Sequence, residues 1–262
     1  METKNIIQSS SLSIGYRTSK AQTIVASDIN IALCTSQITA LVGVNGAGKS
    51  TLLRTLGGLQ KLISGNISIG GKEMSTLSRR DIAQQMSLVL TEKLPDSNLS
   101  VFELVATARQ PYTNWIGSMS ADDLEKVNES LRLTQTETLA AKKIHEISDG
   151  QLQKVMVARA LAQDTPIIIL DEPTTHLDLQ HKISLLKLLK ELAHHHQKCI
   201  FFSTHDIELA IQISDSIIVM NENQVIQETP ANLISSGLFS RLFNDSNIMF
   251  DAEKVKFIFK DI

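Results

Sequence analysis

The stretch LVGVNGAGKST, residues 41–51, combines three glycines with a lysine and two hydroxyl residues. Gly43, Gly48, Lys49 and Ser50 have the spacing Gly-x-x-x-x-Gly-Lys-Ser, which is typical of a phosphate-binding loop between a strand and a helix. The glycines of such a loop let successive N–H groups point at an anion, and the dipole of the following helix adds to their attraction. We therefore expect a nucleoside triphosphate to bind here.

The residues of this loop have different expected roles. Lys49 should reach the β- and γ-phosphates, the hydroxyl of Ser50 should bind Mg²⁺, and Thr51 is placed to touch the α-phosphate. The rest of the expected nucleotide-binding loop consists of Gly43, Asn45, Gly46, Ala47 and Gly48. The alternative is a glycine-rich turn that precedes a helix by chance, but the apolar run before it and the helical pattern after it favour a nucleotide site.

A second chemical element is the carboxylate pair Asp171 and Glu172, which follows the apolar run PIIIL. Carboxylates at the carboxyl end of a buried parallel strand lie where such sheets bind their ligands. We expect Asp171 to hold magnesium and Glu172 to be the general base for the attacking water, a role worth roughly 100- to 10,000-fold in rate. Two acids in a surface turn would not explain the preceding IIIL. The two elements together predict an ATPase that uses ATP and Mg²⁺.

The rest of the chain predicts the fold that positions these residues. Short β-branched runs alternate with longer helical patterns, which indicates an α/β fold with a mostly parallel sheet and helices on both faces. Before Ala40, the segments LSIGY and DINIALC alternate with period two and predict antiparallel strands beside the phosphate site. We expect one domain, with a helical subdomain at 92–163 inserted into a core formed by 1–91 and 164–262. Undetected strands in 92–163 would instead extend the core.

Composition narrows the function classes. The chain has 262 residues, a net charge of -3 and 42% hydrophobic residues, so no basic field favours nucleic-acid binding. No apolar run approaches the roughly 20 residues that span a bilayer, so a second chain would have to supply any membrane part. The N-terminus does not have the pattern of a secretory signal. Cys34 and Cys199 lie in apolar runs and are expected to be reduced core residues.

A third element, Ile147-Ser148-Asp149-Gly150-Gln151, resembles the Leu-Ser-Gly-Gly-Gln signature of the ABC-transporter ATPases when taken with the first two. The resemblance covers essentially the whole chain. It implies a P-loop NTPase fold with an ABC-type core, an antiparallel β subdomain and an inserted helical subdomain. It also implies that Ser148, Gly150 and Gln151 face the ATP of a second copy. Asp149 replaces a glycine of the signature, and it can cap exposed N–H groups at the helix start.

Other residues match this family at single positions. Tyr16 matches the aromatic residue that stacks on adenine, although a tyrosine ending an edge strand is the simpler alternative. His205 matches the histidine that contacts the γ-phosphate, and Asp178 matches the loop that couples two active sites. The family usually has glutamine where this chain has Glu92, with Thr91 as the alternative alignment. We expect Glu92 to bind magnesium and orient water, and the variant Glu92→Gln to retain ATP turnover.

The resemblance also implies partners. Two copies should form a head-to-tail dimer with ATP between them, bound to integral-membrane permease subunits at the cytoplasmic face of the inner membrane and serving a substrate-binding protein indirectly. The segment VFELVATARQPYTNWIG, residues 101–117, looks like the ATPases that import iron-siderophore, heme or cobalamin. A loop with Tyr112, Trp115 and Ile116 would contact a permease subunit, and the alternative for Trp115 is packing under the helical subdomain. Alternatives are a different cargo, a soluble ABC ATPase acting in DNA repair or translation, or a binding module without turnover.

Overall fold

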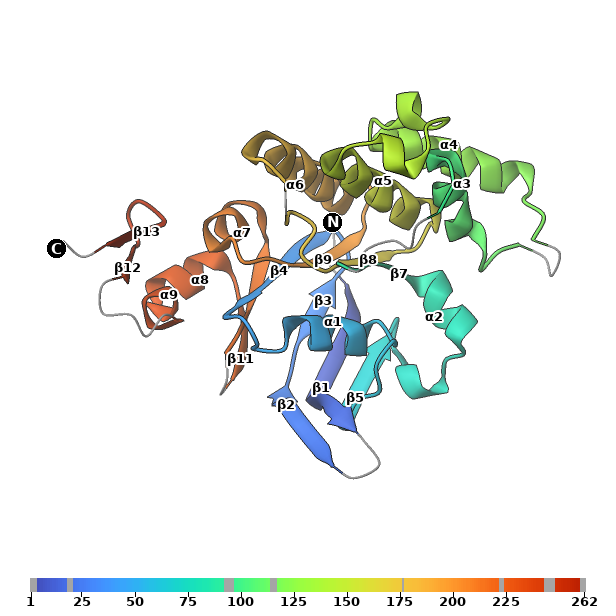
Figure 1. The fold of residues 1–262 in the computed structure, drawn as a ribbon. Coiled ribbons are helices and arrows are strands. Elements are labelled where there is room, and N and C mark those ends of the chain that lie inside the picture. Colours follow the sequence, from blue (N-terminus) through green and yellow to red (C-terminus); the bar gives the residue numbers. More distant parts are fainter. Residues whose placement is uncertain are drawn as a thin grey trace.

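A six-stranded sheet with the order β11-β10-β4-β9-β8-β7 forms the centre of the molecule (Figure 1). This computed structural model describes residues 4–17, 21–91, 97–113, 117–175, 177–221, 224–242 and 248–259. Neighbouring strands are parallel except β11, which pairs antiparallel with β10. The strands are β4 (Gln37–Gly43), β7 (Met86–Val89), β8 (Ile167–Leu170), β9 (Cys199–Ser203), β10 (Ser216–Met220) and β11 (Val225–Glu228). The predicted mostly parallel sheet is confirmed.

The central strands are apolar on both faces, as expected for buried parallel strands. Ile38, Ala40 and Val42 of β4 belong to one apolar cluster, whereas Leu41 belongs to another on the opposite face. The first face is covered by α5 (Asp149–Ala162), α6 (Leu179–His194), α7 (Ile207–Ile213), α8 (Pro230–Ser235) and α9 (Leu238–Leu242) (Figure 1). The second face is covered by α1 (Lys49–Leu56) and by a second sheet. Helices therefore lie on both faces, as predicted.

The second sheet is antiparallel and carries the N-terminal strands. Its members are β1 (Asn5–Arg17), β2 (Gln22–Ile29), β3 (Ala32–Cys34), β5 (Ser64–Ile69) and β6 (Lys72–Glu73). The predicted strand LSIGY lies in β1, and DINIALC is divided between β2 and β3. The break falls at residues 30–31, between the end of β2 at Ile29 and the start of β3 at Ala32. Ile67 and Ile69 point into the core, whereas Asn66 is exposed, which is the alternation expected of a half-buried strand.

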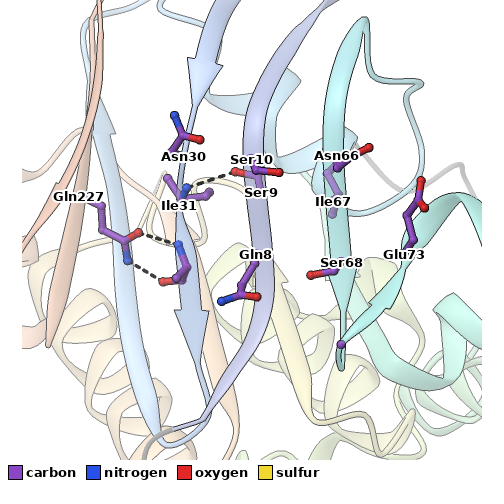
Figure 2. Close-up of a pocket in the computed structure, with 12 residues that line it drawn as sticks. Gln8, Ser9, Ser10, Asn30, Ile31, Asn66, Ile67, Ser68, Glu73 and Gln227 are labelled. Carbon is purple, nitrogen blue, oxygen red and sulfur yellow. Dashed lines mark hydrogen bonds between the residues drawn. The ribbon is translucent and has the colours of Figure 1, made fainter.

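The outer face of the antiparallel sheet forms a polar groove of about 720 Å³ (Figure 2). Gln227 of β11 reaches this sheet at one end of the groove. Its Oε1 accepts a hydrogen bond from the backbone N–H of Ala32 at 2.8 Å, and its Nε2 donates to the carbonyl oxygen of Ala32 at 2.6 Å. These two bonds join the edge strand of the central sheet to β3, so Gln227 fixes the two sheets relative to each other.

A helical lobe lies between β7 and β8. It contains α3 (Val101–Ala106), α4 (Ala121–Leu133) and the segment that leads into α5 (Figure 1). Short 3-10 turns lie at Thr107–Arg109, Glu137–Leu139 and Ile144–Glu146. Within 97–113 and 117–163, the described residues contain no strand beyond an isolated bridge between Ser100 and Lys143. The helices α3, α4 and α5 each begin at a serine cap that is completed by the side chain three residues later: Ser100, Ser120 and Ser148.

The remaining elements connect or extend the core. A 3-10 turn at Met74–Thr76 and α2 (Arg79–Gln85) lead from β6 to β7. The last described residues form a hairpin of β12 (Ile248–Asp251) and β13 (Lys256–Phe259). This hairpin contacts α9 through the rings of Phe250 and Phe239, whose centres are 5.2 Å apart. Within the described parts of the chain, every helix is too short or too polar to span a bilayer.

Candidate active site

The parallel strands β4, β8 and β9 end at one edge of the central sheet, and the predicted chemical residues follow them there. Gly43 ends β4, Asp171 follows β8, and His205 lies two residues beyond β9. Lys49 begins α1, directly after the loop that leaves β4. The sheet therefore brings together residues that are far apart in the sequence.

The loop between β4 and α1 approaches other parts of the chain closely. Gly48 precedes α1 in the left-handed conformation, φ 99°, and a β-carbon there would lie 2.3 Å from Cγ1 of Val25. A β-carbon on Gly43 would lie 2.1 Å from the carbonyl oxygen of Met220 in β10. Both positions therefore require glycine. The tip of the loop holds the exposed Asn45 and Gly46 and the buried Ala47.

Lys49 lies inside the curve of this loop. Its Nζ donates hydrogen bonds to the carbonyl oxygens of Gly43, at 2.9 Å, and Val44, at 3.2 Å. Burial lowers the pKa of Lys49, and the negative charges of Glu172 and Asp171 oppose this shift. The ammonium group is therefore held between the phosphate loop and the two carboxylates, where an incoming phosphate can replace the carbonyl oxygens. Ser50, the next residue, is partly buried.

Asp171 is almost fully buried, with 2% of its surface exposed. Its Oδ1 accepts a hydrogen bond from Oγ of Ser203 at 2.7 Å, and its Oδ2 is 3.4 Å from Oγ1 of Thr91. The same Ser203 oxygen accepts the backbone N–H of Glu172 at 2.8 Å. Ser203 was not predicted from the sequence, because no motif distinguishes a serine at the end of the run CIFFS from an ordinary strand residue.

Glu172 takes an unusual backbone conformation directly after β8. Its φ is 48°, which starts a turn closed by the backbone N–H of Thr175 on the carbonyl oxygen of Glu172 at 3.1 Å. The Thr175 hydroxyl donates to Oε2 at 3.1 Å, and Nε2 of His205 donates to Oε1. The two residues predicted to act on the attacking water and the γ-phosphate are thus in direct contact.

The oxygen donors at this edge fit magnesium. Mg²⁺ is usually bound through one or two carboxylates together with substrate phosphates and water. The buried carboxylate of Asp171 beside the phosphate loop, with the hydroxyl of Ser50 in the first turn of α1, matches that pattern. Across the ranges that the structure describes, no group of three or more His, Cys, Asp or Glu side chains could hold a metal without such phosphates. Glu92, the third predicted ligand, lies outside the described residues.

Tyr16 lies at the end of β1 beside the start of α1. Its ring is exposed, and its hydroxyl is 2.9 Å from Oγ1 of Thr51. Thr51 is buried, and its hydroxyl forms this hydrogen bond with Tyr16. The exposed ring is available for stacking, and the adenine contact stays a prediction.

The predicted signature residues form the start of α5. Oγ of Ser148 accepts the backbone N–H of Gln151 at 3.3 Å, and Oε1 of Gln151 accepts the N–H of Ser148 at 3.1 Å. Asp149 is exposed in the first turn, where the helix dipole favours its negative charge. A β-carbon on Gly150 would lie 3.1 Å from Cδ2 of His181 in α6. Gly150 therefore packs close to α6 of the same chain.

Asp178 caps α6 and holds the same histidine. Its Oδ1 accepts both the backbone N–H and Nδ1 of His181, each at 2.8 Å. The backbone hydrogen bond from His181 is the main reason that the pKa of Asp178 lies below its usual value.

The helices α1 and α5 lie on opposite faces of the central sheet (Figure 1). The fold of one chain therefore does not place Ser148 over its own Lys49.

The importer-like segment is anchored through Arg109. This buried guanidinium donates from Nε to Oδ1 of Asp123 at 2.8 Å and from Nη1 to the carbonyl oxygen of Ala162 at 2.9 Å. It also lies 4.1 Å from the ring centre of Tyr112. Tyr112 therefore packs within the helical lobe. Trp115 and Ile116, the other two candidate permease contacts, lie outside the described residues.

Comparisons with known proteins agree on the family. Residues 26–175 match the profile of the family described as ABC transporter. The achromobactin transport ATP-binding protein of Dickeya dadantii is 37% identical over 241 residues, covering 91% of this chain and 87% of that protein. The iron(3+)-hydroxamate import ATP-binding protein of Bacillus subtilis is 32% identical over 254 residues, covering 96% and 93%.

Two solved structures are similar in fold along most of the chain. An inward-facing ABC transporter of the metal-chelate type aligns with a TM-score of 0.80 and 26% identity, covering 92% of this chain and 89% of that one. The dimeric structure of a bacterial ABC transporter cassette aligns with a TM-score of 0.75 and 26% identity, covering 86% and 99%. These similarities confirm the predicted fold class.

Proposed function

The chain belongs to the ABC transporter family as an ATP-binding and ATP-hydrolysing subunit, and we propose that it powers the import of an iron-siderophore, heme or cobalamin complex. The name of the Bacillus subtilis relative, which specifies iron(3+)-hydroxamate import, supports an iron-chelate cargo. The likeness to a metal-chelate type transporter supports the same class. The segment 101–117, with its buried Arg109, supports it from the sequence.

We assign the steps of hydrolysis to residues at the edge of the central sheet. The amides of the loop after Gly43 and the ammonium of Lys49 bind the phosphates. Ser50 and Asp171 would hold magnesium, which offsets the negative charge of the β- and γ-phosphates when bound. Glu172 accepts a proton from the attacking water, and His205 orients the Glu172 carboxylate and contacts the γ-phosphate.

The observation that carries this proposal is the placement of Glu172 in contact with His205, opposite Lys49. The test compares ATP turnover and ATP binding of the wild type, Glu172→Gln and the control Glu125→Gln, an exposed carboxylate on α4. We expect Glu172→Gln to bind ATP but to lose about 100-fold or more in turnover, and the control to match the wild type. Unchanged turnover in Glu172→Gln would remove Glu172 from its role.

We further propose a head-to-tail dimer in which Ser148, Gly150 and Gln151 of one copy cover the nucleotide of the other. The positions of α1 and α5 on opposite faces of the sheet support a partner-supplied signature. ATP and Mg²⁺ should convert Glu172→Gln, which traps ATP, into a dimer measurable by light scattering. The variant Lys49→Ala should remain monomeric, and equal dimerisation of both variants would contradict an ATP-dependent interface.

We propose permease subunits as the membrane partners, with this chain bound peripherally at the cytoplasmic face of the inner membrane. A substrate-binding protein would then act on the same permease from the other side. The neighbouring reading frames offer a direct check, because a multi-span permease and a binding protein are expected there. Co-purification with that permease, and uptake of the labelled iron chelate that stops in Glu172→Gln, would establish the cargo. Uptake unaffected by Glu172→Gln would instead favour an ATPase acting on another process.

A further inference from the structure

One buried serine contacts both carboxylate residues of the proposed hydrolytic site. Ser203 ends β9, is fully buried, and lies beside the end of β8 because the two strands are parallel neighbours. We propose that Ser203 is a positioning residue for ATP hydrolysis, which fixes the carboxylate of Asp171 and the backbone of Glu172 in a single arrangement. The proposal rests on the roles proposed above for Asp171 and Glu172.

The two hydrogen bonds of the Ser203 hydroxyl fix the orientation of that hydroxyl group. A serine hydroxyl carries a single hydrogen, and here that hydrogen is used toward Oδ1 of Asp171, at 2.7 Å. The lone pairs that remain accept the backbone N–H of Glu172, at 2.8 Å. One oxygen therefore ties the position of the first carboxylate to the backbone of the second.

Each of these two bonds constrains a different step. The bond to Asp171 holds one oxygen of a buried carboxylate, which leaves the other oxygen, Oδ2, on the side of Thr91. The bond from Glu172 holds its N–H at the point where the chain enters the left-handed conformation, φ 48°. That turn directs the Glu172 side chain toward Thr175 and His205. Loss of Ser203 should therefore disturb magnesium binding and water activation together.

A buried serine can also have a purely structural role, and the chain contains a matched example. Ser87 lies in β7 of the same sheet, is also buried, and its Oγ is 3.5 Å from the carbonyl oxygen of Ile167. Its hydroxyl is directed to a backbone oxygen instead of a carboxylate. Ser87→Ala therefore controls for the loss of a buried hydroxyl from the central sheet.

The experiment uses the full chain with Ser203→Ala, Ser203→Thr and Ser87→Ala. It measures kcat and KM for ATP, the melting temperature, and the Kd of a fluorescent ATP analogue with Mg²⁺ and with EDTA. Because a hydrogen bond to a buried charged group is lost, we expect Ser203→Ala to lower kcat roughly 10- to 100-fold and to reduce the gain in affinity that Mg²⁺ provides. The Kd in EDTA should not change, since loop amides and Lys49 remain.

Two comparisons separate positioning from mere stability. Ser203→Thr keeps the hydroxyl and should restore kcat to within about threefold of the wild type, whereas Ser87→Ala should leave kcat and the Mg²⁺ gain unchanged. If the added methyl group of Thr lowers the melting temperature, a double-mutant cycle decides. In the Asp171→Asn background, Ser203→Ala should cause no further loss of the Mg²⁺ gain.

The proposal is overturned if Ser203→Ala keeps the wild-type kcat and Mg²⁺ gain, or if the Ser203 and Asp171 effects simply add. Equal losses in Ser203→Ala and Ser87→Ala would also overturn it. These outcomes leave the proposed function standing as long as the wild type hydrolyses ATP and Glu172→Gln does not. A wild type without ATP turnover would instead refute the proposed function itself.

Discussion

Replacing Asp123 by alanine should destabilise the helical lobe strongly, because it leaves the Arg109 guanidinium buried without its counterion. The two side chains are 4% and 7% exposed and 2.8 Å apart. Removing one partner of such a buried pair costs about 3–5 kcal/mol. Asp123 also accepts the N–H of Ser120 at the start of α4, and a lost cap costs about 1 kcal/mol more. For a chain of this size, we expect a fall in melting temperature on the order of 10 °C.

The assay is thermal and urea unfolding of the wild type, Asp123→Ala and the control Asp122→Ala. Asp122 is an exposed acid in the same first turn, and its loss should change the free energy of unfolding by less than about 0.5 kcal/mol. The double variant Arg109→Met with Asp123→Leu should recover most of the loss, since apolar side chains can replace a buried pair. A loss below about 1 kcal/mol in Asp123→Ala would refute the reasoning.

The pH dependence of this difference gives an independent check. The N–H of Ser120 is the main group that holds the pKa of Asp123 below its usual value, and its hydroxyl and Arg109 act in the same direction. A carboxylate with a lowered pKa in the folded state stabilises above its unfolded pKa of about 3.9 and loses this contribution as the pH falls through the folded value. The gap in stability between wild type and Asp123→Ala should be constant near neutral pH and narrow only in acid.

Three further predictions concern other sites. Gly43→Ala should abolish binding of a fluorescent ATP analogue, because its β-carbon would lie 2.1 Å from the carbonyl oxygen of Met220, and retained affinity would show that the loop can move. Gln227→Ala should lower the free energy of unfolding by about 1–3 kcal/mol, because both hydrogen bonds to Ala32 are lost. Urea unfolding tests this, and the control Gln224→Ala, which removes an exposed side chain, should leave the free energy of unfolding unchanged. Burial raises the pKa of the Cys199 thiol, so iodoacetamide should modify the partly exposed Cys34 first in the native protein. Mass spectrometry measures the labelling, and equal labelling of the two cysteines would contradict the buried position of Cys199.

The phosphate loop was predictable because its requirements are local. The spacing from Gly43 to Ser50 fixes a strand, a tight loop and a helix start, and the structure contains all three. The period-two segments before Ala40 predicted antiparallel strands for a similar local reason. Contacts between distant segments were not predictable from spacing, as the 2.9 Å contact between the hydroxyls of Thr51 and Tyr16 shows. The expected contact of Thr51 with the α-phosphate stays a prediction.

Ser203 and the partner of Arg109 could not be found from spacing. Ser203 meets Asp171 only because β9 lies between β4 and β8, and the sequence order of the strands does not reveal that arrangement. Arg109 looked like part of a family motif, but its carboxylate partner comes from the next helix, α4. Both cases depend on which elements become neighbours, and that is decided by packing of the whole chain.

The helix α5 belongs to two apolar clusters at once. Val155 and Ala158 pack with α3 and α4, whereas Val157 and Leu161 pack over the central sheet. Exchanging the helical lobe between two relatives must therefore take this shared helix into account. A chimera that takes α3 and α4 from a relative but keeps its own α5 would join two surfaces that did not evolve together. A fragment that ends after α5 would, for the same reason, expose the apolar face that α5 packs on the central sheet. Such a fragment should precipitate unless this face is redesigned.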